Sequence, residues 1–107
     1  MKQTKRVRLE RKDWKIGTTQ QLLQLSDEEV AYIELKLALS DRLKSLREKK
    51  AITQIEMAKL ISSSQSRVAK MEAGDPSVSI DLLVKALLAL GATRRQIAGA
   101  MAANRAA

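Results

Sequence analysis

The sequence predicts an all-α fold, a bundle of about five helices with an N-terminal helical extension. The core must consist of Leu, Ile, Val, Met and Ala, because Trp14 and Tyr32 are the only aromatic residues, and such a composition favours helices over sheets. Four Gly and one Pro leave few interruptions. In addition, a Ser or Thr stands in front of each apolar periodic stretch, as the N-cap of a helix does.

Length and composition narrow the class of protein. A chain of 107 residues is one domain's worth. Without Cys or His there are no disulfides, thiolate metal sites, Cys nucleophiles or imidazole bases. We therefore expect no enzyme, no cofactor and no metal. The absence of a leader-like apolar run or a membrane-spanning stretch leads us to expect a cytoplasmic protein.

The charge is strongly basic and unevenly placed. The net charge is +8 and the pI about 10.1, which indicates a polyanionic partner, most commonly nucleic acid, although basic charge can also serve solubility alone. Residues 1–15 carry net +5 and the rest net +3. We interpret residues 1–25 as a flexible basic arm and residues 26–103 as the helical domain. The arm could follow DNA, clasp a partner or act as a solubilising tail, and Trp14 hints at an anchoring contact.

The first helix is expected to begin after Ser26. Ser26 and Glu29 have the spacing of a capping box, and three acids fill the first turn. No Gly or Pro follows before about Lys50. Two offset apolar stripes allow either one long helix or two helices that meet near residues 39–40; they consist of Val30, Ile33 and Leu37, and of Leu39, Leu43 and Leu46.

Four more helices follow from their capping signals. Thr53 is expected to cap a helix to about Ile61, and Ser64 a short helix over residues 65–72, with residues 62–64 as the turn between them. Gly74 and Pro76 end the second of these. Ser79 caps a helix to Leu90, with Gly91 as its C′ glycine, and Thr93 with Gln96 opens a last helix to about Ala102.

Residues 53–72 have the layout of a helix-turn-helix. Val68 and Met71 on the second short helix can pack on Met57 and Ala58 of the first, and Ala58 is small enough for a close crossing. The first helix then braces the second, which lies in the DNA major groove and offers its N-terminal side chains to base edges. Gln suits adenine, whereas Lys and Arg suit guanine.

At this point the chain resembles the lambda-repressor-like family, also called the Cro/xenobiotic-response-element family. The resemblance covers about residues 39–91 and rests on Thr53-Gln54, Ala58, the run 64–68, Met71-Glu72, Gly74 and the run 75–77. It implies a protein that binds double-stranded DNA. On general grounds we also expect a homodimer on a palindromic operator, because one recognition helix reads only a few base pairs and two half-sites give useful specificity. The family's roles fall on a set of polar residues, which we predict as the DNA-binding site: Thr53, Gln54, Ser64, Gln65, Ser66, Arg67, Lys70 and Ser77.

These roles differ among the residues. By resemblance, Gln65, Ser66 and Lys70 would face bases, whereas Gln54 and Arg67 would hold phosphates or adjacent bases. Ser77 would touch phosphate through the N-terminus of the following helix.

The sequence departs from the family pattern in the turn. Ser62 stands where the family usually has Gly, and Ser63 where it usually has an apolar residue. Ser62 must therefore accept a left-handed conformation, at a cost of about 1 kcal/mol, or the turn must be remodelled.

A narrower resemblance concerns residues 64–68, the run 75–79 and the acidic-start helix before the domain, which are similar to HigA-type antitoxins. It implies an antitoxin that represses its own operon and binds a small, basic, RelE-like ribonuclease toxin. Asp27–Glu29 would be a better electrostatic match for such a toxin than the basic arm.

Alternatives stay open at this stage. The chain could be a stand-alone phage-type or metabolic repressor, or an RNA-binding or protein-interaction adaptor that reuses the fold. Leu82 and Leu88 could form a dimer patch or belong to core and ordinary surface. Ile55 and Leu60 could form a partner surface, although scattered exposed apolar residues are normal.

Overall fold

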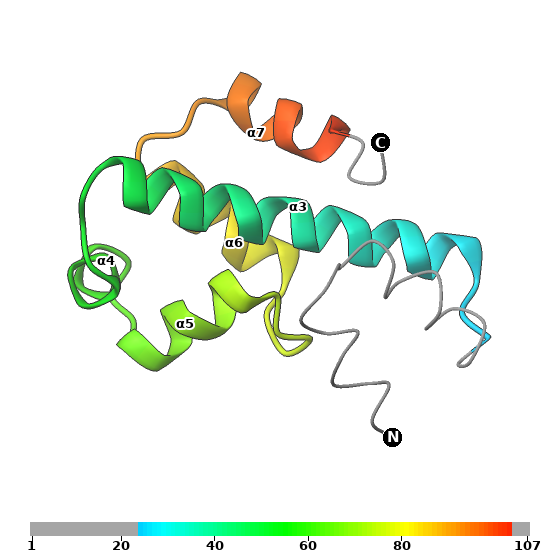
Figure 1. The fold of residues 1–107 in the computed structure, drawn as a ribbon, viewed down its shortest axis with the longest axis horizontal. Helices are drawn as coiled ribbons and strands as arrows, with labels where there is room; N and C mark the ends of the chain where they lie inside the picture. The colour runs from blue at the N-terminus through cyan, green and yellow to red at the C-terminus, as the bar shows by residue number, and fades with distance from the viewer. Residues whose placement is uncertain (1–23, 104–107) are drawn as a thin grey trace. The chain divides into compact units, whose positions relative to one another are not determined.

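The computed structural model describes residues 24–103, and within this range all regular secondary structure is helical (Figure 1). The prediction of an all-α fold with about five helices is confirmed. The predicted basic arm, including Trp14, lies outside the described residues except for Gln24 and Leu25. The helices are α3 (Asp27–Lys49), α4 (Gln54–Leu60), α5 (Gln65–Ala73), α6 (Ile80–Ala89) and α7 (Arg94–Ala102).

The chain divides into two compact units, one that ends at Glu34 and one that comprises Leu35–Ala103. Helix α3 runs through the division without a break. The domain boundary predicted at residue 25 stays a prediction.

Helix α3 decides between the two readings of residues 26–50. It is a single helix of 23 residues and passes through Ser40 without interruption. Its start is the predicted capping box: the Ser26 N–H donates to Glu29 Oε1 at 2.9 Å, and the Glu29 N–H donates to Ser26 Oγ at 3.1 Å. The acids of the first turn lie at the positive end of the helix dipole.

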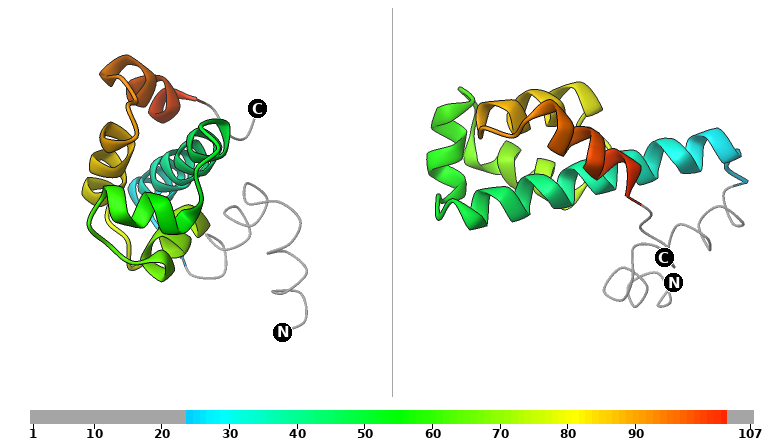
Figure 2. Two further views of the ribbon diagram at one scale, coloured as in Figure 1. Left: turned by 90° about the vertical axis from the view of Figure 1, so that its left-hand side faces the viewer. Right: turned by 90° about the horizontal axis from the view of Figure 1, so that it is seen from above.

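The second unit is built around the C-terminal part of α3. Helices α4 and α5 lie on one side of it and α7 on the other (Figure 2). Buried apolar side chains from all five helices form one cluster. Helix α3 contributes Leu39 and Leu43, and α6 with its C-cap Leu90 contributes the predicted stripe Leu83, Leu87 and Leu90. Fully burying such a side chain contributes about 1.5–3 kcal/mol, so this cluster holds the short helices in place.

Local capping explains where the four shorter helices begin. Thr53, Ser64, Ser79 and Thr93 each accept a hydrogen bond from the amide three residues later, as the sequence predicted. Helix α5 ends at Gly74, which has φ +75°, and a Cβ there would meet Leu37 Cδ2 at 2.6 Å. Both the left-handed backbone and the close approach therefore call for glycine.

The turn after α4 has a left-handed residue at position 62 although that residue is not a glycine. Ser62 has φ 55°, so it accepts the left-handed conformation and the turn is not remodelled. The Ser62 N–H donates to the Lys59 carbonyl at 3.3 Å and the Ser63 N–H to the Ala58 carbonyl at 2.8 Å. This is the Schellman pattern that normally closes on glycine.

None of the described helices is both long enough and apolar enough to cross a membrane.

Candidate nucleic-acid interface

Helices α4 and α5 pack against each other through the residues that the sequence indicated. Met57, Val68 and Met71 are fully buried, Ala58 is nearly so, and all four belong to the core cluster. The small Ala58 leaves room for a close approach of the two helices. This packing fixes the orientation of α5 relative to the rest of the unit.

The opposite face of α5 is polar and open to solvent. Ser64, Gln65, Ser66, Arg67 and Lys70 are all exposed. Ser64 Oγ accepts from the Arg67 N–H at 3.2 Å and lies 3.4 Å from Ser66 Oγ, so these hydroxyls gather at the N-terminus of the helix. A hydrogen-bonding, positively charged helix face of this kind can contact base edges and phosphates.

A cleft of about 390 Å³ runs beside this face. Arg67 and Lys70 give it positive charge, and Val78 and Leu82 form its apolar part. Its remaining lining residues are Ser64, Ser66 and Ser77. Five of the eight predicted DNA-binding residues, Ser77 among them, thus line this one cleft. The other three, Thr53, Gln54 and Gln65, do not line it.

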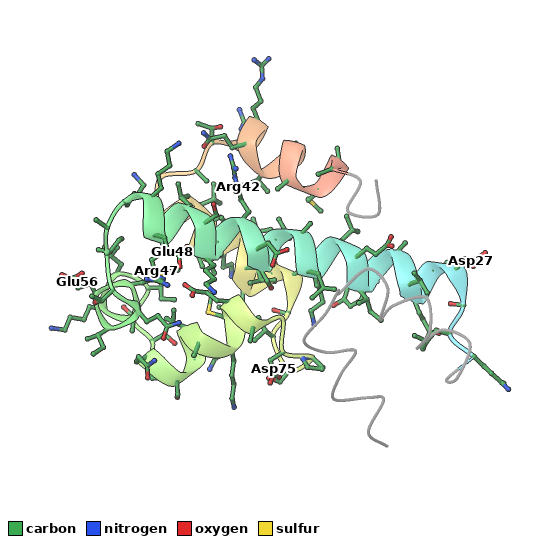
Figure 3. All side chains as sticks on the ribbon, in the orientation of Figure 1. Asp27, Arg42, Arg47, Glu48, Glu56 and Asp75 are labelled. Atoms are coloured by element: carbon green, nitrogen blue, oxygen red, sulfur yellow. The ribbon has the colours of Figure 1, made fainter. Side chains whose placement is uncertain are left out.

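Gln65 and Gln54 are joined to a buried ion pair. Gln65 Nε2 donates to Gln54 Oε1 at 2.6 Å, and Gln54 Nε2 donates to Glu72 Oε1 at 3.1 Å. Glu72 also accepts two hydrogen bonds from the guanidinium of Arg47, from Nε at 2.5 Å and from Nη2 at 3.1 Å. Figure 3 shows Arg47 on the C-terminal part of α3, on the side toward α4.

The ion pair anchors this chain of hydrogen bonds. The side chains of Arg47 and Glu72 are only 12% and 3% exposed, and their bidentate geometry is the strong form of a charged hydrogen bond. The hydrogen bond to Glu72 raises the pKa of Arg47 above its already high usual value. Arg47 therefore stays charged and keeps the carboxylate of Glu72 oriented toward Gln54.

The link constrains Gln65 without using up its hydrogen-bonding groups. One hydrogen of its Nε2 goes to Gln54, but the amide has a second hydrogen and a carbonyl oxygen. These are the two kinds of group that a two-point pair with adenine requires, and the side chain that carries them is already held in place by Gln54.

Ser77 is tied to Asp75. The Ser77 N–H and Oγ donate to Asp75 Oδ1 at 2.8 and 2.6 Å, and these two bonds hold the pKa of Asp75 below its ordinary value. Figure 3 shows Asp75 in the connection between α5 and α6. A phosphate that accepted a hydrogen bond from the Ser77 hydroxyl would have to replace the Asp75 carboxylate as acceptor. It would also lie close to the negative charge of Asp75.

Thr53 stands at the exposed start of α4. Its Oγ1 accepts from the Glu56 N–H at 3.0 Å, and Glu56 Oε1 accepts from the Thr53 N–H at 2.8 Å, which completes a capping box. The hydroxyl hydrogen of Thr53 is not used in this box and remains suitable for a phosphate oxygen.

The sequence did not predict the contacts of three structurally important residues, Arg47, Glu72 and Lys36. The capping pattern gave Arg47 only a role at the end of a helix, and Glu72 only a place in a family motif. Lys36 is buried, and its Nζ donates to the Pro76 carbonyl at 3.2 Å, which ties α3 to the connection before α6. Each contact joins positions 25 or 40 residues apart, so no local pattern announces it.

The apolar residues predicted as possible contact surfaces on α6 and α4 differ in their surroundings. Leu82 lines the cleft beside Lys70, whereas Leu88 is exposed, and six positions on a helix place them about 120° apart. Ile55 and Leu60 are both exposed on α4, but five positions separate them by about 140°. The two members of each pair therefore point in clearly different directions around their helix, and the dimer patch and the partner surface stay predictions.

The braced α4, the turn at Ser62 and the open polar face of α5 define the class: this is a helix-turn-helix protein. Among residues 24–103, no cluster of three or more acidic side chains could hold a metal ion.

The comparison with protein families agrees with the geometry. Residues 43–97, about half of the chain, match the helix-turn-helix family of the Cro/C1 type, and the chain belongs to this family. Its members are sequence-specific DNA-binding regulators and typically not enzymes, so the protein is a DNA-binding regulator. No curated protein and no solved structure matches the chain.

Proposed function

We propose that the protein is a repressor that binds a palindromic operator as a homodimer and reads bases with the exposed face of α5. The observation that carries this proposal is the Gln65–Gln54–Glu72–Arg47 connection, because it holds a base-reading side chain in place from the core outward. Preorganised side chains lose less entropy on binding.

Within this proposal the residues divide by role. Gln65, Ser66 and Lys70 face bases, with Gln65 on adenine and Lys70 on guanine acceptors. Phosphates are held by Arg67, by the hydroxyls of Thr53 and Ser64, and by the α6 N-terminus near Ser77. Gln54 serves mainly as the support of Gln65, since its amide already bonds on both sides.

The homodimer is proposed because one recognition helix can contact only a short DNA sequence. A single recognition helix contacts only a few base pairs, so useful specificity needs two half-sites about 34–36 Å apart. The two half-sites then mirror the two-fold symmetry of the dimer.

The test is an anisotropy titration of the full chain against labelled DNA from upstream of its own gene and against a scrambled duplex of equal length. We expect binding that is at least about a thousandfold tighter to the natural sequence, with two chains per duplex. Equal affinity for both duplexes and for RNA would refute the proposal and favour a polyanion-binding adaptor.

We further propose that the protein is the antitoxin of a toxin–antitoxin module and represses its own operon. The support is the resemblance of residues 64–68 and 75–79, together with the long acidic-start helix, to HigA-type antitoxins. The partner would be a small, basic, RelE-like ribonuclease.

A pull-down of the full chain from its native host tests the antitoxin role, followed by a gel shift of the recovered material on the upstream DNA. Co-purification of a small basic protein, in a complex that binds the promoter, is the expected result. If the chain binds promoter DNA but recovers no such protein, it is a stand-alone repressor.

A further inference from the structure

The start of α3 carries a groove that the DNA-binding surface does not use. The groove has a volume of about 320 Å³ and is lined by Leu25, Glu28, Glu29, Tyr32 and Ile33. Glu28, Glu29, Tyr32 and Ile33 are neighbours at one-turn spacing on one face of α3, and Leu25 lies just before the start of the helix. All of them lie in the first of the two units.

The lining residues define what the groove can hold. Leu25, Ile33 and the ring of Tyr32 form an apolar floor, while Glu28 and Glu29 bring two exposed carboxylates to it. Asp27 adds a third acid in the same turn (Figure 3). An occupant that suits this groove combines a large apolar side chain with flanking positive charges.

The N-terminal part of the chain has this combination. Residues 1–15 carry net +5 and contain Trp14, the single tryptophan, next to Lys15. An indole is the largest apolar group available and buries well in a partly polar site. The opposite signs of this segment and of the groove make them electrostatically complementary.

The connection between the two is long enough. Ten residues separate Trp14 from Leu25, and an extended chain spans about 3.3–3.6 Å per residue. The groove itself covers about two turns of helix, or about 11 Å. In addition, Gln24 has φ 56°, a left-handed turn at the point where the chain enters α3.

We propose that the N-terminal arm, defined as residues 1–23, docks on this groove, with Trp14 on the apolar floor and its basic neighbours at Glu28 and Glu29. Because the arm is tethered beside the groove, its effective concentration there is in the millimolar range. A separate basic protein would have to displace it. This inference does not depend on DNA binding.

Trp14 reports the docking directly, because its fluorescence is not mixed with that of another tryptophan. The experiment measures acrylamide quenching of the full chain without DNA, native and unfolded in guanidinium chloride, at low and high salt. We expect the native chain at low salt to be quenched clearly less than the unfolded chain. This protection should weaken as salt screens the charges.

The Glu28→Gln/Glu29→Gln double variant removes the two carboxylates and keeps the capping box, since Gln serves in that position. Exposed ion pairs are individually weak, so the ratio of docked to free arm should fall about fivefold for the two together. Glu48→Gln/Glu56→Gln is the matched control: it removes two exposed acids elsewhere, also with one capping Glu replaced by Gln. It should leave the quenching unchanged.

Two outcomes overturn the proposal. If Trp14 is quenched equally in the native and the unfolded chain, the arm does not dock, and the groove is left to a basic partner. If Trp14 is protected but Glu28→Gln/Glu29→Gln changes its quenching no more than the control does, Trp14 docks elsewhere.

Discussion

Ser40 is fully buried in α3, and among the described residues its hydroxyl has no hydrogen-bond partner. Burying an unsatisfied polar group costs about 1–3 kcal/mol, and Ala is also the better helix former. We expect Ser40→Ala to raise the free energy of unfolding by about 1–2 kcal/mol, measured by urea denaturation of the full chain.

Ser45 on the same helix provides the control, because it is exposed. Ser45→Ala changes helix propensity alone, which contributes about 0.5 kcal/mol. Equal effects of the two substitutions would mean that burial of the Ser40 hydroxyl carries no penalty.

Lys70 lies one helical turn beyond Ser66 on the exposed face of α5, and we propose that both face bases. Lys70→Ala should weaken binding to the preferred DNA sequence by about 1–3 kcal/mol and relax the base preference at one position, as measured by anisotropy against a set of single-base variants. Lys59→Ala removes another exposed positive charge, from α4, and should leave the base preference intact. If Lys70→Ala weakens binding to all sequences equally, Lys70 contacts phosphate instead.

At the scale of the element, the turn between α4 and α5 contains a strained backbone at Ser62, which a glycine would relieve. Ser62 has φ 55°, and a left-handed conformation costs a residue with a Cβ about 1–2 kcal/mol. Glycine relieves this cost but also makes the unfolded chain more flexible. We expect Ser62→Gly to stabilise the protein by about 0.5–1 kcal/mol, seen as a higher urea midpoint with an unchanged slope.

Substitution of the neighbouring Ser63 by glycine is the control, because it adds a glycine to the same turn without relieving a left-handed backbone. Ser63 is not among the described residues with positive φ, so Ser63→Gly should destabilise the protein through unfolded-state entropy alone. Stabilisation by both substitutions would point to general loop effects rather than strain at residue 62.

The elements show which structure the sequence could predict. Helix starts at Thr53, Ser64, Ser79 and Thr93 are determined by side chains that bond amides three residues away, and such signals are local. The two apolar stripes of residues 26–50 were compatible with one long helix or with two helices. The sequence could not decide between them, because the choice depends on which neighbouring helices pack against each stripe. The contacts of Lys36 with Pro76 and of Arg47 with Glu72 exist only after folding.

The candidate site divides in the same way. The exposed face from Ser64 to Lys70 follows from helical periodicity, so the sequence could place it. The support of Gln65 through Gln54 spans 11 and 18 positions and depends on how α4 and α5 pack. Likewise, the bond from Ser77 to Asp75 is a short-range feature that the family-derived phosphate role had hidden.

At the scale of the whole molecule, the net charge of +8 sets how binding depends on salt. Each phosphate contact that releases counterions adds about 0.9 to the slope of log K against log salt concentration. Residues 1–15 contain seven basic residues, so an arm that tracked DNA phosphates would contribute several units. An arm docked on the groove of Leu25, Glu28, Glu29, Tyr32 and Ile33 contributes little.

We therefore expect deletion of residues 1–15 to lower the salt slope of DNA binding by less than about 1, as measured by anisotropy between low and physiological salt. In the full chain, Glu28→Gln/Glu29→Gln should instead steepen the slope, because the released arm becomes available to phosphates. The same double substitution in the shortened chain is the control and should have no such effect. A slope that falls by several units on deletion alone would show that the arm lies on DNA and not on α3.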